Sequence, residues 1–267
     1  MNPPVSIAVH GASGRMGRAI LRVALKRPQL RIVAAIVKPG ALAGGKPLRV
    51  DFGESAQALS YSTSLDDAAA STVIVDFSTP KAFDDALAFA VSRHLAFVSG
   101  TTGLSHEQHA AIQRAGSVIP VLWSANFSIG VAVLMQLVRE SARALPGWDC
   151  EIFEAHHRNK KDAPSGTALA LGRAVAEARG VDLENVARFD RHASNEAREP
   201  SAIGFSAVRG GDIVGEHTVL FASEGERIEL IHRATDRDIF ARGALDAAAW
   251  LAGRGPGVYT LHDLLAR

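Results

Sequence analysis

Apolar residues follow two different periods along the first half of the chain. Short runs rich in valine, isoleucine and alanine predict strands, and segments with apolar residues three or four positions apart predict helices. The predicted strands are Val5–His10, Arg31–Val37, Thr72–Phe77, Ala96–Ser99 and Val118–Leu122. The predicted helices between them are Met16–Lys26 and Pro80–Arg93. This alternation predicts an α/β fold whose parallel sheet is covered by helices on both faces.

The pattern changes in the second half of the chain. Apolar residues at helical spacing predict one long helix from Phe127 to Leu145, which ends before Pro146. The further predicted strands, which would form a mixed or antiparallel sheet, are Cys150–His157, Ile203–Val208, Ile213–Ala222 and Arg227–His232. The further predicted helices are Ser165–Arg179 and Ile239–Leu251, whereas Val181–Pro200 is polar, without a clear period, and is expected to be a surface excursion.

These elements predict two domains. Residues 1–127 with 235–267 would form a dinucleotide-binding domain, and residues 128–234 an α+β domain for substrate binding and oligomerisation. The short segment Leu261–Leu265 is expected to fold back onto the first domain.

Composition narrows the class of protein. With 29 basic and 28 acidic side chains the formal charge is only +1, which is too little to hold a nucleic acid. The only cysteine is Cys150, so no intramolecular disulfide can form and a reducing cytoplasm is expected. No signal peptide and no apolar run of membrane-spanning length is visible, so we expect no membrane partner.

A glycine-rich turn joins the first predicted strand to the first predicted helix. Gly11, Gly14 and Gly17 have the spacing GxxGxxG. Glycines there allow a tight turn and a close approach of backbone to a pyrophosphate, and the helix N-terminus directs free N–H groups at the anion. The motif therefore favours a Rossmann-like dinucleotide site over a turn that needs glycine for shape alone.

The end of the second predicted strand bears on the choice of coenzyme. NAD-specific sites carry an acid there that binds the ribose 2′-hydroxyl, but this chain has Val37 followed by Lys38. Lys38, helped by Arg15, could pair with a 2′-phosphate, so NADPH should bind at least as well as NADH. The alternative is that Lys38 is a solvated loop lysine.

A dense polar segment, Glu154–Thr167, marks the second domain. His156 and His157 would point to opposite sides of an extended backbone, which disfavours a shared metal ion, so no metal is expected. One imidazole can act as proton donor, and Lys160 adds a positive charge. Ser165, Gly166 and Thr167 would open a helix and provide a second anion site, which suits a dicarboxylate. The alternative is that Ser165 only caps the helix.

Nearly the whole chain resembles the dihydrodipicolinate reductase family, also called 4-hydroxy-tetrahydrodipicolinate reductase, of lysine and diaminopimelate synthesis. The motifs that carry the resemblance are GASGRMGR from Gly11, DFSTP from Asp76, SGTTG from Ser99, SANFSIGV from Ser124, EAHHRNKKDAPSGTA from Glu154 and RGGDIVGEHTV from Arg209. The resemblance implies hydride transfer from NADPH or NADH to a cyclic dicarboxylate, with loss of water and formation of tetrahydrodipicolinate. It also implies a homotetramer assembled through the second sheet.

The resemblance also implies roles for individual residues. His156 would donate or accept a proton, Lys160 would donate one, and His157, Gly166 and Thr167 would hold the substrate. Lys38 would stand where the family often has an arginine for NADPH. The other residues implied to line the cofactor are Gly11, Ala12, Ser13, Gly14, Arg15, Met16, Gly100, Thr101, Thr102, Ser124, Ala125, Asn126 and Phe127.

Two residues depart from the family pattern, and two other functions remain open. Val37 replaces an acid found in many members, and Asn159 stands where many have a third histidine. The first alternative is a redox sensor that binds NADPH without chemistry. The second is another dinucleotide-domain enzyme, such as an aldehyde or amino-acid dehydrogenase, although Cys150 has no obvious catalytic surroundings.

Overall fold

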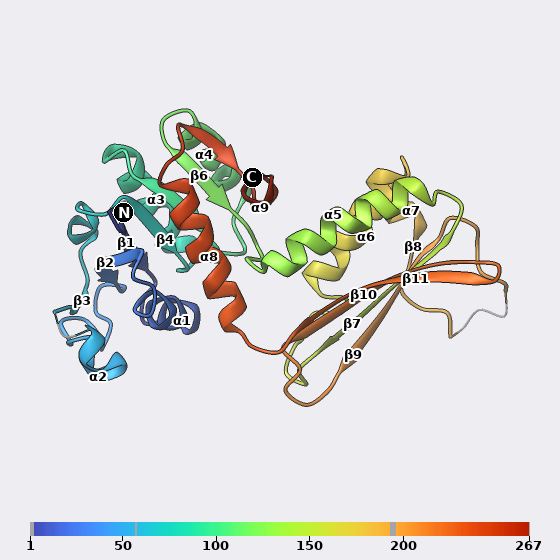
Figure 1. Ribbon diagram of the computed structural model, residues 1–267, viewed down its shortest axis with the longest axis horizontal. Helices are drawn as coiled ribbons and strands as arrows, with labels where there is room; N and C mark the ends of the chain where they lie inside the picture. The colour runs from blue at the N-terminus through green and yellow to red at the C-terminus, as the bar shows by residue number, and fades with distance from the viewer. Residues whose placement is uncertain (1–2, 57, 193–195, 267) are drawn as a thin grey trace. The chain divides into compact units, whose positions relative to one another are not determined.

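The chain folds into two compact units. The computed structural model describes residues 3–56, 58–192 and 196–266 (Figure 1). The first unit comprises Met1–Ile129 and Asp238–Arg267, and the second comprises Gly130–Arg237. The second unit is therefore inserted into the sequence of the first.

The first unit is built on a seven-stranded sheet in which neighbouring strands run parallel, as predicted. The strand order is β3-β2-β1-β4-β5-β6-β12. The strands are β1 (Val5–His10), β2 (Leu30–Ile36), β3 (Tyr61–Ser62), β4 (Val73–Asp76), β5 (Ala96–Ser99), β6 (Pro120–Trp123) and β12 (Gly257–Tyr259). Strands β2 and β3 lie on one side of β1, and β4, β5, β6 and β12 lie on the other. The topological switch point, where α/β sheets bind ligands, therefore lies between β1 and β4.

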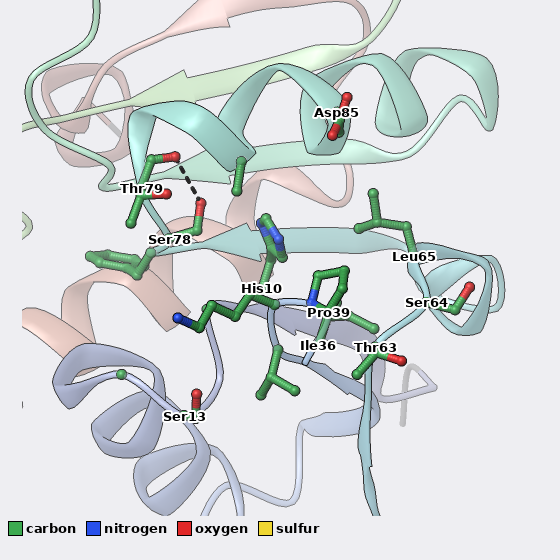
Figure 2. Close-up of a pocket in the computed structure, with 16 residues that line it drawn as sticks. His10, Ser13, Ile36, Pro39, Thr63, Ser64, Leu65, Ser78, Thr79 and Asp85 are labelled. Atoms are coloured by element: carbon green, nitrogen blue, oxygen red, sulfur yellow. Dashed lines mark hydrogen bonds between the residues drawn. The ribbon is translucent and has the colours of Figure 1, made fainter. Parts of the chain in front are cut away.

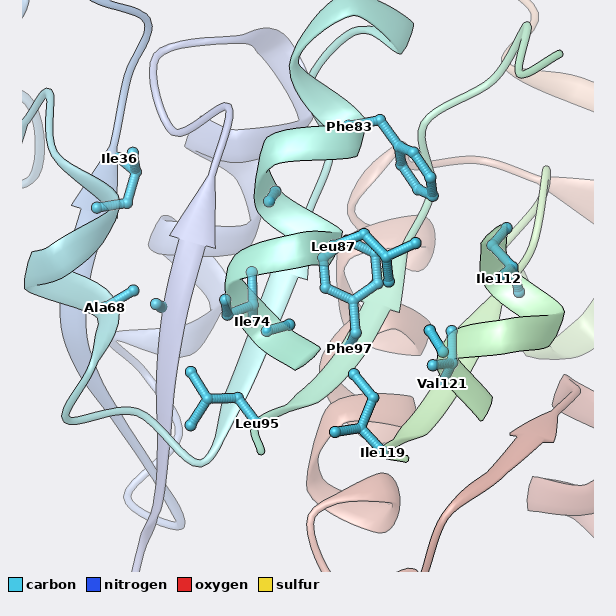
Figure 3. Close-up of a cluster of buried hydrophobic side chains, with 14 of the residues drawn as sticks. Ile36, Ala68, Ile74, Phe83, Leu87, Leu95, Phe97, Ile112, Ile119 and Val121 are labelled. Atoms are coloured by element: carbon cyan, nitrogen blue, oxygen red, sulfur yellow. The ribbon is translucent and has the colours of Figure 1, made fainter. Parts of the chain in front are cut away.

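Helices cover this sheet. They are α1 (Arg15–Ala24), α3 (Pro80–Ser92), α4 (His106–Gly116), α8 (Asp238–Leu251) and α9 (Leu261–Leu265), with the short turns α2 (Arg49–Phe52), η1 (Glu54–Ala56) and η2 (Leu65–Ala68). Helix α8 packs against α1 and against β4, β5 and β6. Figure 3 shows the cluster in which Phe83 and Leu87 of α3 meet Phe97 of β5. Burial of these apolar side chains fixes the helices on the sheet and aligns the strand ends that carry the candidate site.

The second unit has a five-stranded sheet of order β11-β10-β7-β9-β8. Strand β10 is antiparallel to β7 and β11, whereas β9 is parallel to β7 and β8, so the sheet is mixed, as predicted. The elements are α5 (Ile129–Ala144), β7 (Asp149–His156), α6 (Gly166–Ala178), α7 (Leu183–Val186), β8 (Ala187–Arg188), β9 (Ile203–Arg209), β10 (Gly215–Ser223) and β11 (Glu226–Ala234). Figure 1 shows α5 and α6 along one face of this sheet, where their apolar residues form a second core with Ile152 and Val219.

Several boundaries differ from the prediction. Helix α5 begins at Ile129 rather than at Phe127, because Phe127 belongs to the loop after β6 and packs on Phe77, with ring centroids 5.4 Å apart. Strand β6 begins at Pro120 rather than Val118, whose N–H still bonds back to Ala115 at the end of α4. The expected surface excursion contains α7 and β8, and its residues 193–195 lie outside the described part.

Candidate functional site

The glycine loop of the first unit is as tight as its spacing predicts. Gly11 has a φ of +78°, and a Cβ on it would lie 2.4 Å from the carbonyl oxygen of Phe77. A Cβ on Gly17 would lie 2.2 Å from the carbonyl oxygen of Gly11. Both positions therefore require glycine, one for the turn and one for the close approach of α1 to the loop.

The loop leaves the N-terminus of α1 open. Gly14 caps the helix without a side chain, and Ser13 and Arg15 beside it are also exposed. Ala12 is fully buried, and its N–H bonds to Ile36 at the end of β2 2.9 Å away. The first helical N–H groups thus have no side-chain cap and can bind an anion, which fits the pyrophosphate of a dinucleotide.

A cavity of about 470 Å³ adjoins this loop at the carboxyl ends of β1, β2 and β4 (Figure 2). Of the residues predicted to hold the cofactor, Gly11, Ser13, Gly14 and Lys38 line it. The described residues that line it do not include Arg15 or Met16, which occupy the first positions of α1. Lys38 is exposed and also borders a second cavity of about 570 Å³, together with Arg18 and Lys46. Sequence reasoning missed these last two cations.

The remaining predicted cofactor residues follow β5 and β6, at the same edge of the parallel sheet. A Cβ on Gly100 would lie 2.1 Å from the ring of Phe77, so this position also needs glycine. Thr101 is buried, and its hydroxyl accepts from the N–H of Ser78 at 3.1 Å, so this side chain holds two loops together. Of the predicted cofactor residues that follow β5 and β6, Thr102 and Ala125 are exposed.

The loop after β6 is ordered by its own side chains. The hydroxyl of Ser124 donates to the carbonyl oxygen of Asn126 at 2.7 Å, and the side-chain oxygen of Asn126 accepts from the N–H of Ser128 at 2.8 Å. The buried ring of Phe127 closes the loop. These contacts fix the backbone of the loop at the edge of the sheet where the glycine loop lies.

In the second unit, the centre of the predicted cluster is a buried carboxylate. Glu154 is 2% exposed, and both of its oxygens pair with the guanidinium of Arg209 at 2.7 Å. One oxygen lies 2.6 Å from Nδ1 of His156, and the other accepts from the N–H of Ser165 at 3.0 Å. Glu154 and His156 face the same side of β7 because they are two residues apart, and the pairing of β7 with β9 brings Arg209 opposite His156.

Charge and burial set the protonation of this pair. Burial raises the pKa of the Glu154 carboxyl, but hydrogen bonds from Arg209, His156 and Ser165 outweigh it and hold that pKa below its usual 4.5. Burial, with the positive charges of Lys160 and Arg209, lowers the pKa of His156 below its usual 6.5, although Glu154 acts in the opposite direction. The imidazole is therefore mainly neutral near pH 7, with its Nδ1 hydrogen directed at Glu154 and its Nε2 an acceptor.

A second histidine, His217, packs against His156. His217 of β10 is 4% exposed, its Nε2 lies 3.2 Å from the hydroxyl of Ser165, and its ring centroid is 5.3 Å from that of His156. Burial, together with the positive charge that His156 carries when it is protonated in acid, lowers the pKa of His217 to about 4. This neutral ring fixes the Ser165 hydroxyl without adding charge to the cluster.

Lys160 and His157 lie on the loop that follows β7. The ammonium of Lys160 is 2.9 Å from the carboxylate of Asp162, and this contact lowers the pKa of Asp162. The N–H of Lys160 bonds to the carbonyl oxygen of His157 at 3.1 Å, which turns the chain back towards α6. Lys160 is close enough for its charge to act on His156.

Helix α6 begins at the predicted anion site. Ser165 is the N-cap: its hydroxyl accepts from the N–H of Ala168 at 3.2 Å, and the residue is buried. Gly166 is exposed and Thr167 is partly buried. The hydroxyl of Ser165 thus contacts the N–H of Ala168 and the ring of His217. At the start of α6, Gly166 and Thr167 are the residues that reach the surface.

Three members of the cluster were missed by sequence reasoning, which assigned them no role: Glu154, Arg209 and His217. The spacing of Glu154 two residues before His156 was a usable signal, because alternate residues of a strand share a face. Arg209 and His217 come from other strands, and only the sheet register brings them to His156.

Other chemistries find little support in the described residues. Among residues 3–56, 58–192 and 196–266, no group of three or more His, Cys, Asp and Glu side chains is arranged to hold a metal ion. Cys150 is fully buried, and burial raises the pKa of its thiol to about 12, so it is a poor nucleophile. No helix in the described part of the chain combines the length and apolar character needed to cross a bilayer.

Comparison with known proteins identifies relatives of both halves of the chain. The family model for the dihydrodipicolinate reductase N-terminus matches residues 5–127, and that for the C-terminus matches residues 130–265. A 4-hydroxy-tetrahydrodipicolinate reductase of Stenotrophomonas maltophilia is 50% identical over 264 residues, covering 98% of each chain. One of Zymomonas mobilis is 47% identical, covering 98% of this chain and 97% of the relative.

A solved structure shows the same fold. Dipicolinate-bound dihydrodipicolinate reductase from Paenisporosarcina sp. TG-14 superimposes with a TM-score of 0.76 at 22% identity, covering 96% of this chain and 97% of that one. Matching models over both halves, and relatives near 50% identity over nearly the full length, establish the relationship. The chain belongs to the dihydrodipicolinate reductase family.

Proposed function

We propose that this chain reduces 4-hydroxy-tetrahydrodipicolinate to tetrahydrodipicolinate in the diaminopimelate route of lysine biosynthesis. As a member of its family it is an NAD(P)H-dependent oxidoreductase. The reaction consumes the substrate, NAD(P)H and one proton, and it yields tetrahydrodipicolinate, NAD(P)⁺ and water. When bound, the reduced nicotinamide supplies the hydride.

The buried Glu154 network carries this proposal, because it joins a proton-transfer group to an anion site. Glu154 fixes Nδ1 of His156 and, through its other oxygen, the first residue of the α6 cap. A dicarboxylate held at Gly166 and Thr167 would therefore lie near the imidazole. Helix N-termini favour carboxylates, and the Lys160 ammonium adds a second positive centre.

The proposed roles follow from these positions. His156 exchanges a proton through Nε2, because Nδ1 is committed to Glu154. Lys160 donates a proton and attracts the substrate, and its ion pair with Asp162 is exposed enough to be exchanged for a substrate carboxylate. His157, Gly166 and Thr167 bind the substrate, and Ser165 contributes by shaping the helix start.

The coenzyme roles belong to the first unit. The glycine loop and the start of α1 would hold the pyrophosphate, and the loops after β5 and β6 would border the nicotinamide. Lys38 would attract a 2′-phosphate, and Arg18 and Lys46 share its second cavity.

We expect Lys38→Glu to weaken NADPH binding more than NADH binding, measured by coenzyme fluorescence. Equal losses for the two coenzymes would remove Lys38 from this role.

The main experiment follows NADPH oxidation by the loss of absorbance at about 340 nm, where reduced nicotinamide absorbs. The substrate is generated by the preceding synthase. We expect His156→Ala to lower kcat about 100-fold or more while coenzyme affinity stays unchanged, and Lys160→Ala to raise KM and lower kcat. The exposed His106 and Lys81 on other helices provide matched controls, His106→Ala and Lys81→Ala. Unchanged kinetics in both site variants would reject these roles, and binding of NADPH without oxidation would favour a sensor.

A further inference from the structure

A second buried histidine–carboxylate pair lies in the first unit, at the topological switch point. His10 ends β1 and Asp76 ends β4, and the two residues are paired in the register of these neighbouring strands. Nδ1 of His10 lies 2.8 Å from an oxygen of Asp76. No role proposed above uses this pair, although ligands of α/β sheets bind at the switch point.

The surroundings of Asp76 determine which nitrogen of His10 carries a hydrogen. Asp76 is fully buried, and its second oxygen accepts from the hydroxyls of Ser99 at 2.7 Å and Thr101 at 2.8 Å. A carboxylate has no hydrogen to donate. The hydrogen between His10 and Asp76 is therefore on Nδ1, and in the neutral ring Nε2 is an acceptor.

The side chain of His10 borders a cavity. The side chain is 9% exposed, and it lines the cavity of about 470 Å³ that adjoins the glycine loop. Figure 2 shows its ring in the middle of the lining side chains, between Ser78 and Leu65. Within the described part of the chain, Nε2 has no hydrogen-bond partner and is not closed off from solvent.

We propose that Nε2 of His10 accepts a hydrogen bond from the adenosine half of the bound dinucleotide. This inference rests on the proposed coenzyme site. The cavity lies at the carboxyl ends of β1, β2 and β4, and it includes Val37 and Lys38 at the end of β2, where dinucleotide folds bind the adenosine ribose. Adenosine offers two kinds of donor to a neutral imidazole, the 6-amino group and the ribose hydroxyls. His10 is thus a binding residue oriented by Asp76.

The proposal can be tested with His10→Phe, which keeps an aromatic ring but removes the acceptor. The dissociation constants of NADH and of reduced nicotinamide mononucleotide, which lacks adenosine, would be measured by fluorescence. We expect His10→Phe to weaken NADH about three- to tenfold, the effect of one neutral hydrogen bond, and to leave the mononucleotide unchanged. The control His106→Ala should bind both as the native chain does.

The reduced hypoxanthine analogue of NADH distinguishes the two donors, because it lacks the 6-amino group. If the 6-amino group is the donor, the native chain binds the analogue more weakly than NADH, whereas His10→Phe binds the analogue and NADH equally well. If a ribose hydroxyl is the donor, His10→Phe weakens both equally. NADH affinity that is the same in His10→Phe and the native chain would overturn the proposal, whereas a native chain that binds no NADH would overturn the coenzyme site itself.

A measurement on the native chain avoids any effect of the substitution on folding. The ¹⁵N shifts of the imidazole distinguish a protonated nitrogen from an acceptor nitrogen. We expect Nδ1 of His10 to carry the hydrogen and the Nε2 resonance to shift when NADH, but not the mononucleotide, is added. A hydrogen on Nε2 in the neutral ring, or a resonance that NADH does not move, would contradict the assignment.

Discussion

Buried carboxylates destabilise a fold unless hydrogen-bond donors surround them, and both carboxylates at the strand ends meet that condition. Glu154 accepts from Arg209, Ser165 and His156, and Asp76 accepts from Ser99, Thr101 and His10. In each case one acceptor atom is used to hold an imidazole. The same local arrangement therefore recurs in both units, with a proposed proton-transfer role in one and a proposed binding role in the other.

His217 should make folding stability depend on pH. Its pKa is about 4 in the folded chain against an ordinary 6.5, so between these values the unfolded chain binds more protons. The free energy of unfolding should fall as pH drops through this window, by about 3 kcal/mol in total. Denaturant titrations of the native chain and of His217→Gln, at a series of pH values, measure the difference.

The comparison needs a control, because the pKa values of His156 and His232 are also lowered. In addition, the charges of Glu154 and Lys160 act on the ring of His217. Exchanging the exposed His106 for glutamine removes a titrating group without changing this cluster. We expect that variant to follow the native profile, while His217→Gln loses less stability in acid. Parallel profiles for all three proteins would show that His217 titrates normally.

Elements with a strong periodic pattern could be predicted from the sequence, and elements defined by pairing could not. Helices α1, α3 and α8 begin within about two residues of their predicted starts because an amphipathic period marks them. Strands β3 and β12 have two and three residues and exist only through pairing with β2 and β6. Helix α4 was missed although Ser105 and Gln108 form its capping box, a signal that the sequence does carry.

The residues of the candidate site also fall into two groups, those that local sequence patterns predict and those that only strand pairing brings together. Gly11 and Gly17 were predictable because backbone geometry alone demands glycine, and His156, Lys160 and Ser165 lie within one short stretch. Contacts of Glu154 with Arg209 span 55 residues, and they depend on the register of the second sheet. Short-range spacing therefore predicted the proposed proton-transfer groups and also carried a signal for Glu154, but it could not predict Arg209 and His217, which other strands contribute.

The packing of α1 on the glycine loop should tolerate no added methyl group. In Gly17→Ala the new Cβ would meet the backbone oxygen of Gly11 at 2.2 Å, and backbone cannot move aside easily. We expect a loss of about 1–3 kcal/mol in the free energy of unfolding and weaker NADH binding. Urea titration and fluorescence measure the two effects.

Gly147 provides the matched control, because a Cβ there would have no neighbour within 4 Å. Gly147→Ala should therefore retain native stability and native coenzyme affinity. If both alanine variants behaved alike, close approach of α1 to the loop would not be the reason for glycine at position 17.

Among residues 130–192 and 196–237, no helix covers one face of the second sheet. Phe153, Val208 and Ile231 are 44%, 56% and 43% exposed, and the strand register places all three on the face opposite α5 and α6. Exposed apolar side chains on a sheet face are typical of a surface that meets another copy of the chain. Such a surface is what assembly of the homotetramer implied by the family resemblance would need.

Introducing charge on this face should separate the subunits. We expect the native chain to sediment as a tetramer and Phe153→Glu to sediment as a smaller species at the same concentration. Val118→Glu, which also charges an exposed apolar residue but lies in the turn before β6, should keep the native mass. A monomeric native chain, or an unchanged mass for Phe153→Glu, would contradict assembly through this sheet.

The insertion of the second unit has a consequence for how the chain is made. Strand β6 ends at Trp123, but α8, which packs on β4, β5 and β6, begins at Asp238, and β12 follows at Gly257. A nascent polypeptide leaves the ribosome from its N-terminus, so α3 and α4 are made before the inserted unit, whereas α8 is still missing from those strands while the inserted unit is being synthesised. The inserted unit can fold during translation, whereas the coenzyme-binding unit is completed only after α8 and β12 have been synthesised.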